Sequence, residues 1–180
     1  MTESQERLTR VEARLRQIER EGAPARFDVG VKEVPAMLVV SVRRVEPDIY
    51  SMVRRTYEVG ELIRASNARI VGPTRNVFHF EGFRERDLDV EIALPVADDS
   101  PLDIVLSDGR RVGIRTLEEV PRMAYVIWRG DGPSLTEAYT SIMSWIGENG
   151  YRVVGPPREV YLRDGAQPEK MFEIQYPIGE

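Results

Sequence analysis

The sequence predicts an α+β fold built from two similar half-domains with antiparallel sheets. Three pairs of short motifs recur in the same order and at nearly constant spacing, which is the signature of an internal repeat. They are EVPAM at 33–37 and EVPRM at 119–123, RIVGP at 69–73 and RVVGP at 152–156, and EIALPV at 91–96 and EIQYPI at 173–178. We therefore expect repeats at about 27–97 and 110–178, joined by a turn-rich linker near 100–109.

The first repeat reads as two strands, a helix and two more strands. Strands are predicted at 27–35 and 36–44 on either side of a Val-Pro break, because runs of β-branched residues favour strands. The helix is expected to begin near Glu46–Pro47, where proline suits the first turn, and to end near Ala65. A Gly-Pro turn then precedes strands at 75–82 and 88–96.

The second repeat follows the same pattern. Strands are predicted at 111–121 and 122–130, a helix begins near 132–134, and strands follow at 158–165 and 170–178. Ile142, Trp145 and Ile146 have helical spacing, and Gly150 lies beyond the helix end. Each helix is expected to cover one face of its sheet. The opposite faces would then form a central ligand cleft near a pseudo-twofold axis.

Residues 1–22 predict an amphipathic helix that precedes these repeats. Leu8, Val11, Leu15 and Ile18 are spaced 3, 4 and 3 apart, which is a narrow coiled-coil stripe. Such a stripe must pack against something. It either caps its own domain or forms a homodimer with a second copy.

Composition excludes several classes of function. The 180 residues contain no cysteine and one histidine, His79, so we expect no metal site and no cofactor. No apolar run is long enough to cross a membrane and the N-terminus lacks a signal-peptide core, which predicts a cytoplasmic protein. The net charge of −5 argues against a broad nucleic-acid surface.

Alternation along the third strand of each repeat predicts which side chains face the cleft. Val160 and Leu162 are expected to face the helix, and Glu159 and Tyr161 to face the cleft. In the first repeat, Val77 and His79 would face the helix. The cleft side would then hold the first-repeat residues Asn76, Phe78 and Phe80.

Alignment of the Gly-Pro turns sets Glu159 opposite Asn76, so the predicted cleft holds a carboxylate on one side and a neutral amide on the other. Such a carboxylate pairs with an arginine, takes up a proton, or receives a cation from a ligand. Arg158 is adjacent in sequence but should face the other side of the strand. An ion pair with another arginine remains an alternative.

Other aromatic and acidic residues are assigned by position. Trp128, Tyr57 and Tyr50 could add aromatic faces to the cleft for cation–π contact, whereas core packing is expected for three further rings. Those three rings are Trp145, Phe172 and Tyr139. The alternating acids Asp87, Asp89 and Glu91 read as a solvated strand edge rather than a metal site.

The Val-Pro-x-Met strand, the helix, the segment GPPREVY at 155–161 and the closing E-I-x-x-P strand resemble the GyrI-like small-molecule-binding domain, also called the AraC effector-binding domain. The resemblance covers about 150 residues. It implies two halves around a central pocket in which an acidic residue, ringed by tyrosines, receives lipophilic cations. By the motif match that residue is Glu159, and a pocket aromatic falls at Trp128.

The resemblance implies a protein that binds a small amphipathic molecule, cationic or aromatic, as an effector. The N-terminal stripe is similar to the linker of MerR-type regulators, but no helix-turn-helix precedes it, so direct DNA binding is not expected. Stand-alone members of the family imply one alternative, a hydrolase of strained, cyclopropane-bearing compounds with Glu159 as general base and Tyr161 as donor. The second alternative is a module that binds and inhibits a partner protein.

Overall fold

The structure is a computed structural model, and it describes residues 27–130, 134–163 and 170–180. The helix predicted over residues 1–22, with any dimer contact through it, lies outside the described residues. The described elements, in chain order, are β1 (Gly30–Val34), β2 (Met37–Asp48), α2 (Ile49–Arg64), β3 (Arg75–Phe78), β4 (Arg86–Pro95), β5 (Asp103–Val105), β6 (Arg111–Leu117), β7 (Val120–Arg129), α3 (Leu135–Glu148), β8 (Arg152–Val153), β9 (Arg158–Arg163) and β10 (Met171–Gly179).

The α+β fold is confirmed, with a single antiparallel sheet in the described part of the chain. Nine of its ten strands follow the path β1-β7-β10-β9-β3-β4-β2-β6-β5, and β8 pairs with β10. At the centre of the path β3 pairs with β9, and this pairing sets Asn76 directly opposite Glu159. The short strand β5 lies in the segment predicted as a linker.

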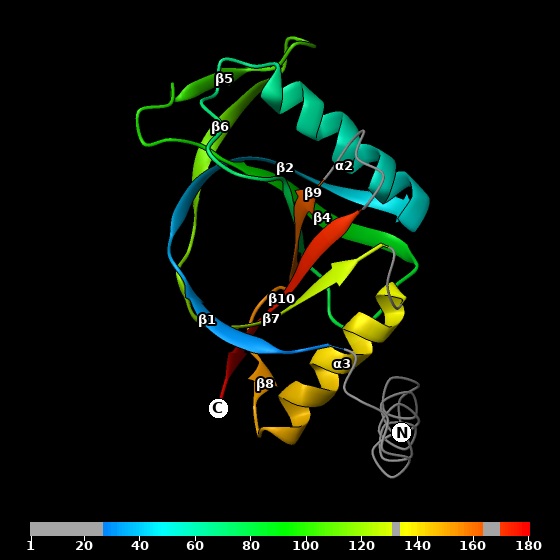
Figure 1. The fold of residues 1–180 in the computed structure, drawn as a ribbon. Helices are drawn as coiled ribbons and strands as arrows, with labels where there is room; N and C mark the ends of the chain where they lie inside the picture. Colours follow the sequence, from blue (N-terminus) through cyan, green and yellow to red (C-terminus); the bar gives the residue numbers. More distant parts are fainter. Residues whose placement is uncertain (1–26, 131–133, 164–169) are drawn as a thin grey trace.

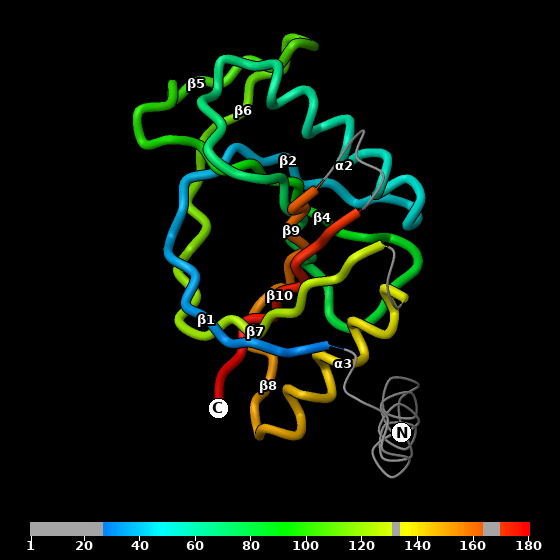
Figure 2. The backbone as a smooth tube through the Cα atoms, in the orientation of Figure 1, coloured from blue at the N-terminus to red at the C-terminus, as the bar shows by residue number. Residues whose placement is uncertain are grey.

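The strands before and after each Val-Pro form one long bent ribbon. Val34 pairs with Val120 on one side of the bend, and Met37 pairs with Leu117 on the other. The chain from β1 into β2 therefore runs alongside the chain from β6 into β7. On the left of Figures 1 and 2 this ribbon curves from the end of the sheet near β6 to the end near β1 and β7.

The two helices lie on the same side of the sheet, to the right of the strands in Figure 1. Helix α2 begins after Asp48, whose carboxylate accepts the Ser51 backbone N–H at 2.7 Å. Helix α3 begins after Ser134, which forms a capping box with Glu137. We call the face of the sheet under these helices the helix face, and the other the inner face.

Both faces of the central strands β3, β4 and β9 are largely buried. Under α2 the helix face packs Val59 and Ile63 against residues such as Ile92 and Leu94, and under α3 it packs Ile142 against Ile174. The inner face has a smaller apolar cluster of its own, formed by Val39, Val77, Ala93 and Leu117.

The predicted orientation of the third strands is wrong. Glu159 and Tyr161 bond to side chains on the helix side, as described below, and Phe78 packs in the core under α2. Val77 instead belongs to the inner-face cluster. The ribbon buries the inner face as well, so apolar side chains are buried on both faces and do not identify the side of the helix.

Polar residues on the inner face are also more buried than expected. Glu91, predicted on a solvated edge, is only 3% exposed. It accepts bonds from Ser41 and Arg115, and His79 lies 2.8 Å from its carboxylate on this same face. His79 therefore does not face a helix.

Candidate ligand-binding site

The candidate site is centred on Glu159, a carboxylate buried under α3. Its side chain is on the helix face of β9 and the residue is 6% exposed. The Tyr139 hydroxyl of α3 donates a hydrogen bond to one carboxylate oxygen, and the Tyr161 hydroxyl donates to the other at 3.2 Å. Among the described residues no arginine or lysine forms an ion pair with Glu159, so the alternative of a structural ion pair finds no support there.

A chain of hydrogen bonds joins this carboxylate to the other half of the sheet. The Asn76 side-chain amide donates to the Tyr161 hydroxyl at 3.0 Å and to the Thr56 hydroxyl at 2.9 Å. Thr56 in turn donates to the Met52 carbonyl of α2 at 2.9 Å. The network therefore runs from α2 through β3 and β9 to α3, and it holds the Tyr161 ring in one orientation.

Aromatic rings surround the carboxylate. The Tyr139 and Tyr176 rings meet edge to face at 6.3 Å between centroids. Tyr161 contacts Phe172 at 4.7 Å, and Phe172 contacts Trp128 at 5.1 Å. A carboxylate among rings of this kind suits a cationic or aromatic ligand, because each ring presents a negative face.

Burial raises the pKa of Glu159, and the two tyrosine hydrogen bonds partly offset this rise by favouring the ionised form. Burial and the nearby Glu159 carboxylate also raise the pKa values of Tyr139 and Tyr161 well above the ordinary tyrosine value. Both tyrosines therefore stay protonated and act as donors. The site holds one titratable carboxylate supported by two neutral hydroxyls.

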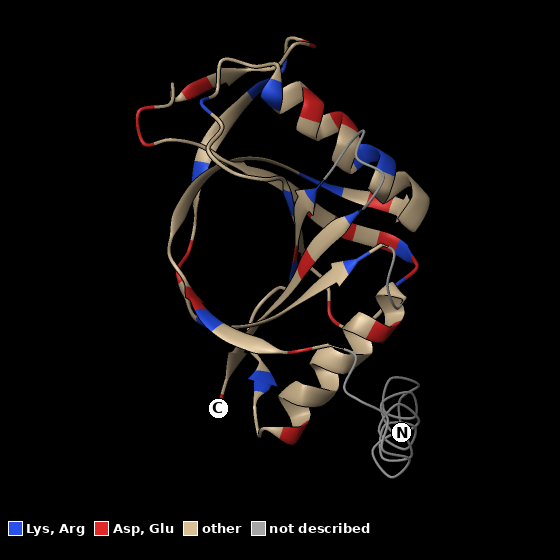
Figure 3. Cartoon of the chain, viewed as in Figure 1, with Lys and Arg blue, Asp and Glu red and all other residues tan. Residues whose placement is uncertain are grey.

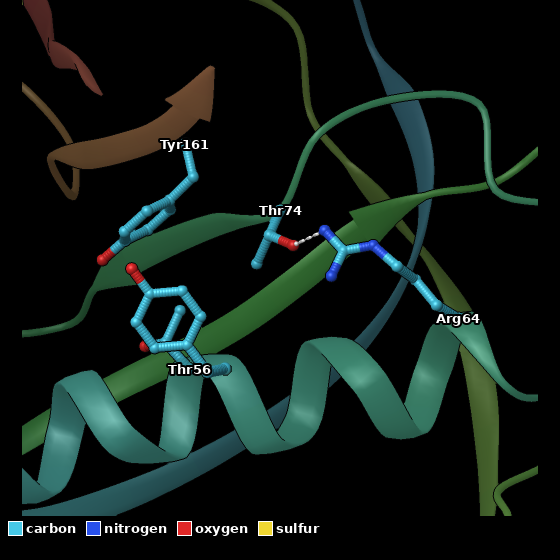
Figure 4. Close-up of a pocket in the computed structure, with 5 residues that line it drawn as sticks. Thr56, Arg64, Thr74 and Tyr161 are labelled. Carbon is cyan, nitrogen blue, oxygen red and sulfur yellow. Dashed lines mark hydrogen bonds between the residues drawn. The ribbon is translucent and has the colours of Figure 1, made fainter. Parts of the chain in front are cut away.

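Tyr161 also borders a small recess beside α2. Its lining residues are Thr56, Tyr57, Arg64, Thr74 and Tyr161. Figure 4 shows the Tyr161 side chain pointing towards α2, and the Arg64 guanidinium bonded to the Thr74 hydroxyl at 2.8 Å. Tyr161 thus connects this recess to the Glu159 carboxylate.

The structure brings some of the predicted site residues together and separates others. Asn76 joins the network around Glu159 and Tyr161, Trp128 lies beyond Phe172, and Tyr57 lines the recess. Phe78 instead packs against Phe80 in the core under α2, with the two ring centroids 5.8 Å apart. Tyr50 lies at the exposed start of α2 and is 78% exposed.

Sequence reasoning missed two members of the site. Tyr139 and Phe172 were assigned to core packing, and Tyr139 proves to be a hydrogen-bond donor to Glu159. A signal was present, because Tyr139 precedes the buried Ile142 and Ile146 by three and seven positions, which puts it on the sheet-facing stripe of α3. The contact between Tyr161 and Thr56 through Asn76 left no pattern in the sequence.

The sequence matches no protein-family model and no curated protein. Among solved structures, the C-terminal domain of EcmrR is 25% identical and superposes with a TM-score of 0.70 over 86% of this chain and 98% of that domain. A cryo-EM structure of an EcmrR–DNA complex gives 25% identity and a TM-score of 0.74. That match covers 96% of this chain, which spans 65% of the EcmrR chain.

Two proteins from Listeria innocua share the fold at lower identity. An uncharacterised conserved protein is 18% identical, with a TM-score of 0.60 over 91% of this chain and 98% of its own. A hydrolase is 14% identical, with a TM-score of 0.57 over 92% and 98%. These similarities in fold are consistent with the resemblance to GyrI-like domains that the sequence motifs carry.

Two features are absent from the described residues. None of the helices there is long and apolar enough to span a bilayer. Nor do three or more histidine, aspartate or glutamate side chains converge there as a metal site.

Proposed function

We propose that this protein binds a lipophilic aromatic cation, or an aromatic hydrogen-bond donor, on the helix face of the sheet. One observation carries the proposal: Glu159 is buried among aromatic rings, held by two tyrosine hydroxyls, with no ion-pair partner among the described residues. The GyrI-like fold supports ligand binding, and the carboxylate supports the charge of the ligand.

The energetics favour a cation over a neutral ligand. A carboxylate removed from water loses hydration that two neutral hydroxyls replace only in part, so an incoming positive charge gains the attraction that water no longer screens. Each ring face that contacts the cation would add about 1–2 kcal/mol when the contact is desolvated. Tyr139 and Tyr176, which meet edge to face beside Glu159, are suited to this contact.

The Glu159→Gln variant tests the proposal, because it keeps the shape of the side chain and removes its charge. In calorimetric titrations with lipophilic aromatic cations such as tetraphenylphosphonium, we expect the variant to bind at least tenfold more weakly, which corresponds to about 1.4 kcal/mol. Tyr139→Phe should weaken binding less, since it removes a donor and leaves the charge.

Glu61→Gln serves as the matched control, because it removes the same charge from an exposed position on α2. Its affinity for the cations should equal that of the unmodified protein. Equal affinity in Glu159→Gln and Glu61→Gln would contradict the role of Glu159.

We also infer that the two halves are copies of one ancestral unit that diverged at the site. The recurring motifs and the strand path, which runs in the same order outwards from the β3–β9 pair on both sides, support this. Divergence to Glu159 in one copy and Asn76 in the other gives a single charge and a neutral amide that orients Tyr161.

A hydrolase is the second candidate, and the raised pKa of Glu159 is the observation that favours it. A general base works best when its pKa approaches the working pH. Hydrolysis of a strained cyclopropane substrate should then lose rate as the pH falls and Glu159 takes up a proton. A pH–rate profile without that acidic limb would exclude Glu159 as the base.

A further inference from the structure

Two arginines lie next to each other on the inner face, at the centre of the sheet. Arg75 is on β3 opposite Val160, and Arg158 is on β9 opposite Val77, so the two arginines are diagonal neighbours across the central strand pair. Diagonal cross-strand neighbours are about 7–8 Å apart. Arg75 is 7% exposed and Arg158 is 5% exposed. Over the described chain as a whole, by contrast, basic and acidic positions are interspersed (Figure 3).

The carboxylates buried on the same face are already bound to other groups. Glu91 accepts two bonds from Arg115, each 2.5 Å long, and further bonds from Ser41 and His79. Glu173 is paired with Lys32 and accepts a bond from the Gln175 amide at 2.7 Å. Neither Arg75 nor Arg158 forms an ion pair with a carboxylate of the described residues.

The two guanidinium groups also have buried donors that are not satisfied. Within the described residues, Arg75 Nε and both Nε and Nη1 of Arg158 are buried without a hydrogen-bond acceptor. Arg75 Nη1 donates to the Met37 sulfur, a weak acceptor, at 2.9 Å. Burial, followed by the nearby Arg158 charge, lowers the pKa of Arg75 to about 10, and the Glu173 carboxylate acts in the opposite direction. Burial and the Arg115 charge lower the pKa of Arg158, against the opposing effect of Glu91.

We propose that Arg75 and Arg158 form a binding site for a small oxyanion, a phosphate or a carboxylate group, on the inner face of the sheet. Planar guanidinium groups match the geometry of such an anion and can donate two parallel bonds to it. An oxyanion between the two arginines would accept hydrogen bonds from unpaired guanidinium nitrogens and offset the repulsion between two buried like charges. The site is separate from the Glu159 site, because Arg158 and Glu159 project to opposite faces of β9.

Thermal unfolding and calorimetric titration of the whole chain with sodium phosphate, sodium sulfate and sodium acetate test this site, with ionic strength held constant by sodium chloride. We expect a saturable rise in Tm and one-to-one binding of at least one oxyanion. Arg75→Met and Arg158→Met should each weaken that binding at least tenfold. Tighter binding of phosphate or of acetate identifies which group the site takes.

Two variants control for charge and for the other site. Arg43→Met removes one positive charge from an exposed position on β2 of the same sheet, where Arg43 is paired with Asp89. This variant should leave the affinity within twofold. Glu159→Gln should leave the affinity for the oxyanion unchanged. Arg158→Lys keeps the positive charge but replaces the planar guanidinium with an ammonium group, so it should also weaken binding. This variant tests the site if Arg158→Met does not fold.

The proposal is overturned if none of the three oxyanions raises the Tm above that in sodium chloride alone. An equal loss of affinity in Arg43→Met and Arg158→Met would also overturn it, because the effect would then be general charge screening.

Discussion

At the scale of single residues, the buried carboxylates of Glu159 and Glu91 lie on opposite faces of one sheet and have opposite electrostatic surroundings. Among the residues that the structure describes, Glu159 accepts hydrogen bonds from two neutral tyrosine hydroxyls, and burial raises its pKa. Glu91 is also buried, but bonds from Arg115, Ser41 and His79 outweigh that burial and lower its pKa to about 2. Glu159 should therefore stabilise the fold more in its protonated form, and Glu91 more in its ionised form.

The raised pKa of Glu159 predicts that its contribution to stability falls as pH rises. The folded protein keeps the proton to a higher pH than the unfolded chain, so the unfolding free energy should decrease from the ordinary glutamate pKa of 4.5 up through the raised value. Urea unfolding between pH 4.5 and 8 should show this decrease in the unmodified protein. Glu159→Gln should lack it.

Glu91→Gln is the matched control, because the pKa of Glu91 is lowered whereas that of Glu159 is raised. Its deficit in unfolding free energy should be about 1–3 kcal/mol at pH 7, because charged hydrogen bonds are lost. That deficit should disappear as the pH falls from 4.5 towards 2, where Glu91 itself takes up a proton. A Glu159→Gln profile parallel to that of the unmodified protein would show that Glu159 does not titrate in this range.

At the scale of secondary-structure elements, the start of α3 positions the donor Tyr139. The Ser134 hydroxyl accepts the Glu137 backbone N–H at 3.2 Å, and the Glu137 carboxylate accepts the Ser134 backbone N–H at 3.0 Å. These bonds satisfy two amides at the first turn of the helix. Tyr139 follows in the next turn, so the cap fixes the part of α3 that reaches Glu159.

Ser134→Ala should therefore lower the unfolding free energy by about 1 kcal/mol, which is the usual cost of losing an N-cap. Thermal or urea denaturation measures the change. Ser141→Ala is the matched control, because Ser141 lies inside α3 and bonds to its own helix at the Glu137 carbonyl. There alanine should be neutral or slightly stabilising, given its higher helix propensity. Equal losses in the two variants would contradict the capping role.

At the scale of the whole molecule, strand pairings join the N-terminal and C-terminal halves of the described chain. β1 precedes the first helix in sequence but pairs with β7, and β6 precedes the second helix but pairs with β2. The central pairing of β3 with β9 joins the halves again. Neither half can therefore complete its sheet alone, and the described part of the chain should unfold as one cooperative unit.

This cooperativity can be measured because both tryptophans, Trp128 and Trp145, lie in the second half. Ile63→Ala removes buried volume from the core under α2 in the first half and should cost about 2–5 kcal/mol. Unfolding followed by tryptophan fluorescence should shift as far as unfolding followed by circular dichroism. Separate midpoints for the two signals would show that the halves unfold independently.

The sequence by itself determined the α+β class and the approximate bounds of the helices, because strand and helix periodicities and caps are local properties. It also predicted that Asn76 lies opposite Glu159, since residues at equal distances from two similar turns meet across the central strand pair. Its assignment of Tyr139 to the core failed because that assignment considered burial and not the hydroxyl.

Only the tertiary structure decided which face of the sheet carries the site. The bent ribbon encloses the inner face, so Val160 and Tyr161 are 5% and 4% exposed on opposite sides of the same strand. Alternation sorts the side chains of a strand onto two faces, but it does not show which face lies under the helices when both faces are buried. The pairings of β1 with β7 and of β6 with β2 are likewise long-range, and no local pattern specifies them.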